Sequence, residues 1–253
     1  MVLIIVGIVL IVVGAGVLPL LARRSAGRAR TFAEVPRYDC AQIAAHGADA
    51  PGMRVAVTGR SARADDGALT APASGRPCVW YRLVVSERHR RTDRDSDGKS
   101  TTRIEERVVS EERSPDIITI TDTTGSVGVQ PGKGKIDRAL EVFNRVEQAK
   151  SGMAMSIAIG GISLDLPSGG GLVGVRTREE ILPTDTDLYV LGGAFSRDSQ
   201  GIIDKPNDGP FVISTRSAQE LERGARTGAR WFTGGAAVTV VVGIVLVVLG
   251  IIL

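Results

Sequence analysis

Cysteine and histidine are scarce in this chain. Its 253 residues contain two of each, namely Cys40, Cys78, His46 and His89. A disulfide framework needs several cysteine pairs, and a closed zinc site needs short ligand spacings that these four residues do not have. Cys78 and His89 have the residue types of a nucleophile and a base, but the types alone match many inert pairs. We therefore expect Cys78 to be a small buried apolar residue, and we expect no metal ion or other cofactor.

Aromatic residues are also few, at 4% of the chain, and the acidic and basic residues are interleaved with a net charge of +3. Proteins that bind nucleic acid usually gather basic residues on one face and stack bases on aromatic side chains. Neither pattern occurs here, so we expect no nucleic-acid partner. Arginine outnumbers lysine, and alanine, glycine and valine are abundant, which suggests a bacterial source with a GC-rich genome.

Charge is absent from both ends of the chain, in residues 1–22 and 232–253. A helix of roughly 20 apolar residues crosses the hydrocarbon core of a bilayer, so we predict two transmembrane helices. A cleaved signal peptide would have basic residues before a shorter apolar run, whereas here Arg23 and Arg24 follow a long one. The second run lacks the small-residue site and polar spacer of a lipid-anchor signal. These features predict a two-pass membrane protein.

The flanks that face the middle of the chain are basic. We interpret residues 23–52 and 215–231 as basic linkers, and nine arginines lie near the two spans on this side and none on the outer ends. Positive charge near a membrane helix tends to remain in the cytoplasm, so we expect a cytoplasmic domain, external termini and the plasma membrane of a bacterium. Anionic lipid head groups are the expected contacts of Arg23, Arg24, Arg28, Arg226 and Arg230.

Glycines recur at seven-residue spacing in both apolar runs. Gly7 and Gly14 lie on nearly one face of the first helix, and Gly243 and Gly250 lie on nearly one face of the second. Small residues let helix backbones approach closely in lipid. We therefore expect the helices to pair, either within one chain or between chains of a homo-oligomer.

The region between the linkers, residues 53–214, is predicted to be a β-rich domain. Alternating or β-branched segments predict strands at residues 53–59, 78–85, 103–111, 181–195 and 209–214. Residues 117–129 predict two short strands joined by the turn Asp122-Thr-Thr-Gly125, and their arrangement suggests an OB-like ligand-binding fold.

One segment has helical spacing. Apolar residues recur along residues 136–150 at the period of an amphipathic helix, which we expect to dock on the core. Residues 152–174 are rich in glycine, and we expect a weakly ordered insertion with a short strand at 157–166. The predicted fold class is therefore two transmembrane helices flanking a β-rich α+β domain, with OB-like strands and one amphipathic helix.

Two short motifs resemble a calcium-binding loop and a phosphate-binding loop, but neither matches in full. Asp93, Asp95 and Asp97 match the opening of a calcium loop, but its twelfth position is Ile104 instead of a bidentate glutamate. Residues 131–135 (PGKGK) lack the spacing of a phosphate-binding loop. We interpret the first as a solvated hairpin tip and the second as a turn before the predicted helix.

Four segments in order resemble a known family. They are residues 74–85 (SGRPCVWYRLVV), 118–131 (ITITDTTGSVGVQP), 178–195 (REEILPTDTDLYVLGGAF) and 208–214 (DGPFVIS). Together with the order helix, domain, helix, they resemble the GIDE or BAM ("beside a membrane") domain. That domain occurs in RING-type E3 ubiquitin ligases of the mitochondrial outer membrane and in shorter bacterial relatives. The resemblance implies a β-rich domain next to a membrane.

The chain differs from these ligases in the residues of their chemistry. Their RING follows the second helix and needs eight cysteine and histidine ligands, whereas this chain contains four such residues. We therefore expect a non-enzymatic, membrane-tethered module that binds another protein. A ubiquitin ligase-like activity, as the resemblance implies, and an OB-like ligand binder are the alternatives. The ligases also place the domain in the intermembrane space, which conflicts with the arginine distribution.

The most distinctive residues of the four segments are expected to be structural. Trp80 and Val79 should point to opposite faces of one strand, and Asp122 should accept backbone hydrogen bonds in its turn. An exposed ligand groove lined by Trp80 or Tyr81 is the functional alternative. The full set with a predicted structural role is Pro77, Cys78, Trp80, Tyr81, Asp122, Gly125, Tyr189, Gly192 and Phe211.

Overall fold

The computed structural model describes residues 2–63, 69–95, 97–114, 117–149, 155–166, 171–197 and 200–252. The chain divides into two compact units. A helical unit combines Met1–Pro36 with Arg216–Leu253, and a β unit comprises Arg37–Thr215.

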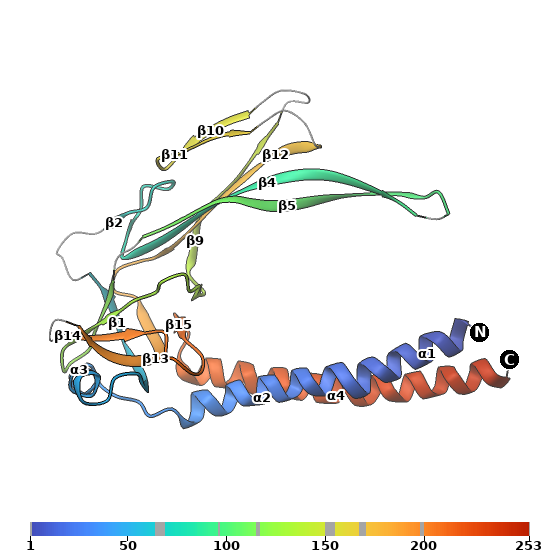
Figure 1. The fold of residues 1–253 in the computed structure, drawn as a ribbon, viewed down its shortest axis with the longest axis horizontal. Helices are drawn as coiled ribbons and strands as arrows, with labels where there is room; N and C mark the ends of the chain where they lie inside the picture. Colours follow the sequence, from blue (N-terminus) through green and yellow to red (C-terminus); the bar gives the residue numbers. More distant parts are fainter. Residues whose placement is uncertain are drawn as a thin grey trace. The chain divides into compact units, whose positions relative to one another are not determined.

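The helical unit is an antiparallel pair of long helices. Its first arm runs through α1 (Val2–Val12), a π-helical turn η1 (Val13–Val17) and α2 (Leu18–Glu34), and its second arm is α4 (Ala218–Ile252). The two arms lie side by side (Figure 1). Both are long and apolar enough to cross a membrane, and the most apolar window of each is only 11% buried. A soluble core helix would be mostly buried, so these surfaces suit contact with lipid.

The helices continue into the segments that we interpreted as basic linkers, through residues 23–34 and 218–231. Alanine and arginine are strong helix formers, which favours continuation beyond the apolar run. Ser217 and Glu220 form a capping box at the start of α4, with Ser217 N–H donating to Glu220 Oε2 at 2.9 Å. α2 ends at Glu34, and Val35 is extended, because the residue before a proline, here Pro36, is disfavoured in a helix.

Glycines lie where the two arms meet. A Cβ added to Gly7 would lie 2.7 Å from the carbonyl oxygen of Gly243, and one added to Gly14 would lie 2.8 Å from Val240 Cγ2. The backbones therefore approach more closely than larger residues would allow. This contact joins helices of one chain, and pairing between chains stays a prediction.

Five strands of the β unit close a barrel. β1 (Met53–Ala62), β6 (Ile118–Thr121), β7 (Ser126–Val129), β14 (Gln200–Asp204) and β13 (Asp187–Arg197) pair in that order, and β13 pairs back to β1. β15 (Val212–Ser214) and β8 (Ile136–Asp137) extend the sheet beyond β13. This closed ring of five strands resembles the barrel of an OB-fold, and the hairpin predicted at 117–129 forms β6 and β7.

The barrel interior is filled by apolar side chains. Val57, Ile120, Val190 and Ile203 are at most 1% exposed and belong to one continuous cluster with Trp80. Among the residues that the structure describes, these side chains fill the interior of the ring, as in other small barrels.

A short helix that we did not predict packs against the barrel. α3 (Cys40–Asp49) lies within residues 23–52, the segment interpreted as a basic linker. Asp39 caps the helix, since its side chain accepts a hydrogen bond from the Gln42 N–H at 2.8 Å. The Gln42 side-chain oxygen in turn accepts the Asp39 N–H, which completes a capping box. Ile43 is fully buried against the barrel, so burial of one face stabilises a helix too short to persist alone.

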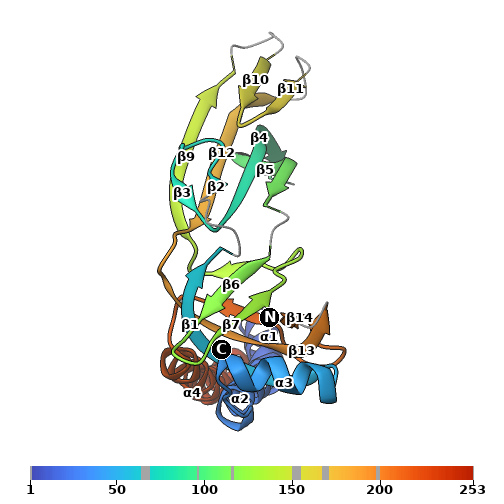
Figure 2. The ribbon, with the colours of Figure 1, turned by 90° about the vertical axis from the view of Figure 1, so that its left-hand side faces the viewer.

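A second sheet has four antiparallel strands in the order β5 (Ser100–Arg113), β4 (Trp80–Arg94), β12 (Leu172–Leu182) and β9 (Leu140–Gln148). Two small hairpins accompany it, β2 (Leu69–Thr70) with β3 (Pro77–Cys78) and β10 (Met155–Ile159) with β11 (Ile162–Leu166). Figure 2 shows this sheet and its hairpins. Parts of the predicted insertion, residues 152–154 and 167–170, lie outside the described residues.

The helix predicted at residues 136–150 is wrong, because the described part of this segment forms β8 and β9. Leu140–Gln148 pairs with β12 along most of its length, with an irregularity opposite Glu179 and Glu180. Arg138 takes a positive φ of 57°, which breaks a regular helix between the two strands. A free edge of β12 satisfies the backbone of this segment, and such tertiary pairing outweighs a helical spacing of apolar residues.

The strand predicted at 181–195 is also two strands. β12 ends at Leu182 and β13 begins at Asp187. Pro183 and the positive φ of 57° at Asp185 produce the turn between them.

Candidate interaction surface

The two faces of the four-stranded sheet differ in what covers them. On one face, Val85 and Val175 pack against the β10–β11 hairpin, and Ile181 packs against Ala71 and Cys78 near the β2–β3 hairpin. On the same face Glu179 is fully buried and accepts the N–H groups of Ala73 and Ser74 at 2.7 and 2.8 Å. We call this the covered face.

Side chains of the opposite parity form what we call the arginine face. Alternation along paired strands places these residues on one side of the sheet. They include Arg82, Val84, Ser86, Arg88, Arg90 and Arg94 of β4, Ile104, Glu106, Val108, Glu111 and Arg113 of β5, Arg176, Arg178 and Glu180 of β12, and Glu141, Asn144 and Val146 of β9.

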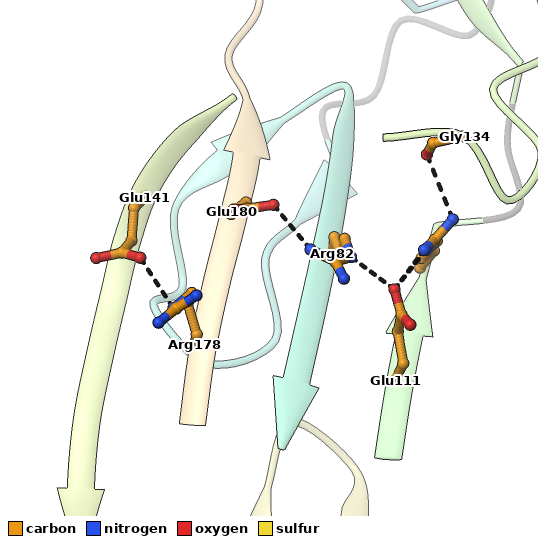
Figure 3. A network of polar contacts seen from close by, with 7 residues as sticks. Arg82, Glu111, Gly134, Glu141, Arg178 and Glu180 are labelled. Carbon is orange, nitrogen blue, oxygen red and sulfur yellow. Dashed lines mark hydrogen bonds and ion pairs between the residues drawn. The ribbon is translucent and has the colours of Figure 1, made fainter. Parts of the chain in front are cut away.

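Arg82 lies at the centre of a cross-strand network (Figure 3). Its guanidinium contacts Glu111 at 2.6 Å and Glu180 at 3.2 Å, so one cation links three strands. Arg113 also pairs with Glu111 and donates to the carbonyl of Gly134 at 3.3 Å. The arrangement fixes the guanidinium planes, because each is held from two sides.

The charge states of this network are stabilised by its geometry. The hydrogen bond from Arg82, reinforced by Arg113, lowers the pKa of Glu111 despite partial burial. Burial disfavours the charge on Arg82, but its hydrogen bonds to Glu111 and Glu180 outweigh that effect and raise its pKa. Both groups therefore remain ionised throughout the physiological range.

Further ion pairs continue the pattern on both sides. Glu106 pairs with Arg88 at 3.3 Å and with Arg176 at 2.9 Å, and Arg178 pairs with Glu141 at 3.1 Å. Each carboxylate of this face therefore contacts at least one arginine.

Arginine is nevertheless in excess on this face, with seven arginines against four glutamates. β12 follows β4 only as far as His89, so the rest of β4 and the start of β5 project as a two-stranded arm (Figure 1). Arg90 and Arg94 lie on this arm, and no carboxylate within the described ranges pairs with either. The surplus positive charge is therefore exposed on the arm.

The other side of the arm is internally neutralised. Arg91 and Arg103 pair with Asp93 and Glu105 at 2.8–3.4 Å. Asp93 was the first residue of the calcium-loop match, and its carboxylate is occupied by two arginines. Among the residues that the structure describes, no group of three or more His, Cys, Asp or Glu side chains is arranged to hold a metal ion.

Exposed apolar side chains lie among the arginines. Ile104, Val108 and Val146 are 51%, 56% and 36% exposed. A surface that combines arginine with apolar groups is typical of the centre of a protein interface, where arginine is enriched.

The residues with a predicted structural role lie elsewhere, in three places. Trp80 is fully buried in the barrel cluster, and its indole Nε1–H has no hydrogen-bond partner among the described residues. Cys78 is fully buried beside the half-buried Tyr81, whose hydroxyl donates to Glu112 at 2.8 Å. Pro77 is exposed and pairs with Thr70 in the β2–β3 hairpin.

Asp122 and Gly125 form the β6–β7 turn. The Asp122 carboxylate accepts the N–H groups of Thr124 and Gly125 at 2.7 and 3.1 Å. Its second oxygen accepts the N–H of Cys40 at 2.8 Å, which ties the turn to α3. Gly125 has a φ of +156°, a conformation that side chains rarely adopt.

Tyr189 and Gly192 belong to β13 in the barrel wall, and Phe211 packs against the barrel core. Tyr189 is 1% exposed, and a Cβ on Gly192 would lie 2.6 Å from Ile203 Cγ2 and 3.1 Å from Phe211 Cδ2. These positions agree with a packing function, and the stability measurements that would establish it stay predictions.

Neither cysteine is placed for nucleophilic chemistry. Burial raises the pKa of Cys78 to about 11 and that of Cys40 to about 12, so both thiols are protonated at neutral pH. His89 pairs with Glu87 at 2.9 Å. Lys133 and Lys135, the basic residues of PGKGK, precede a strand in place of the expected helix, so no helix N-terminus completes a phosphate site.

Sequence reasoning missed the arginine face because its residues come from four strands spread over about a hundred positions. A local signal existed: Arg176, Arg178 and Glu180 repeat at every second residue of one segment. Charged residues at a spacing of two indicate one polar face of a strand.

Comparison with known proteins gives the family. Residues 85–250 match the family described as GIDE, E3 Ubiquitin ligase. The chain is 33% identical over 101 residues to "E3 ubiquitin-protein ligase SP1" of Arabidopsis thaliana, an alignment that covers 40% of this chain and 28% of that protein. No solved structure matches. Because the family match spans more than half of its residues, this chain belongs to the GIDE family.

Proposed function

We propose that this protein is a non-enzymatic, membrane-tethered module whose arginine face binds an acidic segment of a partner protein. The observation that carries the proposal is the surplus of arginine on this face, above all the exposed Arg90 and Arg94 on the projecting arm. Exposed Ile104 and Val108 supply apolar contact area beside the charges. Charge complementarity of this kind steers association and orients a partner.

The non-enzymatic part of the proposal is supported by the two thiols and by the carboxylates of the arginine face. The two thiols are buried and protonated, and the carboxylates of the arginine face are ion-paired.

Ubiquitin ligase-related activity is the second candidate, and the family description and the name of the relative support it. The chain spans 28% of that relative's length, so the relative's activity extends to this protein only as a hypothesis. A ubiquitin-transfer assay with the purified chain tests it directly. Transfer that depends on the chain would overturn the non-enzymatic proposal.

For location, we favour the plasma membrane of a bacterium with the β unit in the cytoplasm. The arginine-rich flanks of α2 and α4 support this orientation through the distribution of positive charge. The abundance of arginine, alanine and glycine supports the bacterial source.

A binding experiment with a defined probe tests the partner proposal. The full chain is placed in lipid nanodiscs, and a fluorescent peptide of alternating glutamate and valine is titrated in, with a lysine–valine peptide for comparison. We expect the acidic peptide to bind selectively and to weaken as salt rises, because screening acts on exposed charges.

Matched variants localise the effect. Arg90→Gln with Arg94→Gln removes two charges from the arginine face, whereas Arg107→Gln with Arg145→Gln removes two from the opposite parity of the same sheet. We expect the first pair to weaken binding roughly 10-fold, at about 0.7 kcal/mol for each exposed charge, and the second to change it less than about 2-fold. Equal losses in both pairs, or equal binding of both peptides, would contradict the proposal.

A further inference from the structure

The helical unit contains a cavity that the partner-binding proposal does not use. It has a volume of about 430 Å³ and lies between α2 and α4. Small-molecule sites commonly range over about 300–1,000 Å³. The small side chains of α2 that leave this space open are those of Ala26, Ala29 and Ala33.

The charged groups around the cavity are mostly cationic. Arg30 and Glu34 of α2 and Arg226 and Arg230 of α4 complete the lining. Arg226 pairs with Glu222, but within the described ranges no carboxylate pairs with Arg30 or Arg230. With Glu34 in the lining and Glu222 on Arg226, three guanidinium groups face two carboxylates, and this net positive charge favours an anion. Guanidinium binds phosphate oxygens in a two-pronged geometry.

The cavity lies next to the predicted membrane surface. Arg230 is followed by Trp231, which is 77% exposed, and then by the uncharged run of α4. Tryptophan is enriched at the level of the lipid head groups. On α2, Arg30 comes eight residues after Ala22, which corresponds to about 12 Å of helix. A long arginine side chain can reach part of this distance back toward the membrane surface.

We propose that this cavity binds the phosphate of an anionic phospholipid, with Arg30, Arg226 and Arg230 as its ligands. Basic pockets between membrane helices hold such head groups, and the alanine floor leaves room for the glycerol portion. None of these residues belongs to the β unit, so this site stands or fails separately from the binding of a partner protein.

Quenching of Trp231 fluorescence tests the site. The full chain is reconstituted in phosphatidylcholine nanodiscs that contain a small fraction of brominated lipid, either phosphatidylglycerol or phosphatidylcholine. Bromine quenches only nearby indoles, and Trp80 is fully buried in the barrel and gives a constant background. We expect brominated phosphatidylglycerol to quench more strongly than brominated phosphatidylcholine at the same fraction.

Two triple variants separate a site from diffuse attraction. Arg30, Arg226 and Arg230 are changed to Gln in the first, and Arg23, Arg24 and Arg223, which do not line the cavity, are changed to Gln in the second. We expect the first to reduce the preference for anionic lipid on the order of tenfold and the second by less than about threefold. Nanodiscs expose both leaflets, so a change of orientation does not affect the comparison.

The remaining outcomes decide against the site. Equal losses in the two triple variants would show diffuse attraction to the surface and overturn the cavity as a binding site. The last experiment adds inorganic phosphate as a competitor. If millimolar phosphate abolishes the preference for phosphatidylglycerol at constant ionic strength, the cavity binds free phosphate and the lipid assignment is wrong. Persistence of the preference supports the lipid.

Discussion

Replacement of Asp122 should uncouple α3 from the barrel. The carboxylate accepts the N–H groups of Thr124 and Gly125 and the Thr124 hydroxyl through Oδ1, and the Cys40 N–H through Oδ2. It thereby joins a turn between two strands to the first residue of a helix 82 positions away.

The magnitude follows from the number and exposure of these bonds. A hydrogen bond to a charged acceptor contributes about 1.5–3 kcal/mol when buried, and water replaces much of an exposed one. Three of the four bonds are exposed and the one to Cys40 is partly buried. We therefore expect Asp122→Ala to lower the free energy of unfolding of the β unit by about 2–3 kcal/mol.

Asp122→Asn should cost about half as much. The amide retains one acceptor for Thr124 and Gly125 but presents an NH₂ group to the Cys40 N–H, which leaves that donor without an acceptor. Asp187→Asn is the matched control, because the Asp187 side chain is 83% exposed and its contact with Arg60 is long, at 3.6 Å.

The assay is urea unfolding of the full chain in detergent micelles, followed by the fluorescence of Trp80 in the barrel core. Loss of α3 contacts should also increase proteolysis near residue 40. A change below about 0.5 kcal/mol for Asp122→Ala would show that the turn and α3 are held by other contacts, and it would refute this reasoning.

The same aspartate predicts a pH dependence. Although partial burial opposes its charge, hydrogen bonds from Thr124 and Cys40 lower the pKa of Asp122 well below its ordinary range. Because the folded pKa is lowered, its contribution to stability is complete above the unfolded value of about 3.9 and is lost as pH falls toward the folded value. The stability difference between the wild type and Asp122→Asn should therefore be constant above about pH 5 and shrink below pH 4.

Three further predictions concern the core, the helix pair and the topology. Trp80→Ala should destabilise the β unit by about 3–5 kcal/mol, seen as loss of protease resistance, whereas a resistant variant that no longer binds a partner would place Trp80 in a site. Gly243→Ile should separate α4 from the first helical arm and raise the proteolysis of this helix pair. Gly234→Ile is the control, because a Cβ there meets nothing within 4 Å, and it should leave the proteolysis unchanged. A cysteine introduced at Ser100 on the arm should resist membrane-impermeant maleimide in intact cells, because the β unit is proposed to lie in the cytoplasm. The two native thiols are buried and should not contribute to the labelling. Labelling at residue 100 would reverse the proposed orientation.

The sequence by itself determined the two long apolar helices and the short β6–β7 hairpin. Uncharged runs of about 20 residues leave few alternatives, because backbone groups in lipid must be satisfied within the segment. The Asp122-to-Gly125 turn is equally local, since its side-chain acceptor and its glycine lie within four residues. The order of the four familiar segments also indicated the GIDE family, which the comparison confirmed.

Tertiary structure alone decided the fate of residues 140–148 and the arginine face. The same apolar spacing suits a helix or an edge strand, and the free edge of β12 determined the outcome. Arg82 meets Glu111 and Glu180 only after β4 pairs with two strands in a register that one residue of slip would destroy. A sequence shows each strand's alternation, but which carboxylate lies opposite which arginine depends on long-range hydrogen-bond register, and a local pattern does not contain that information.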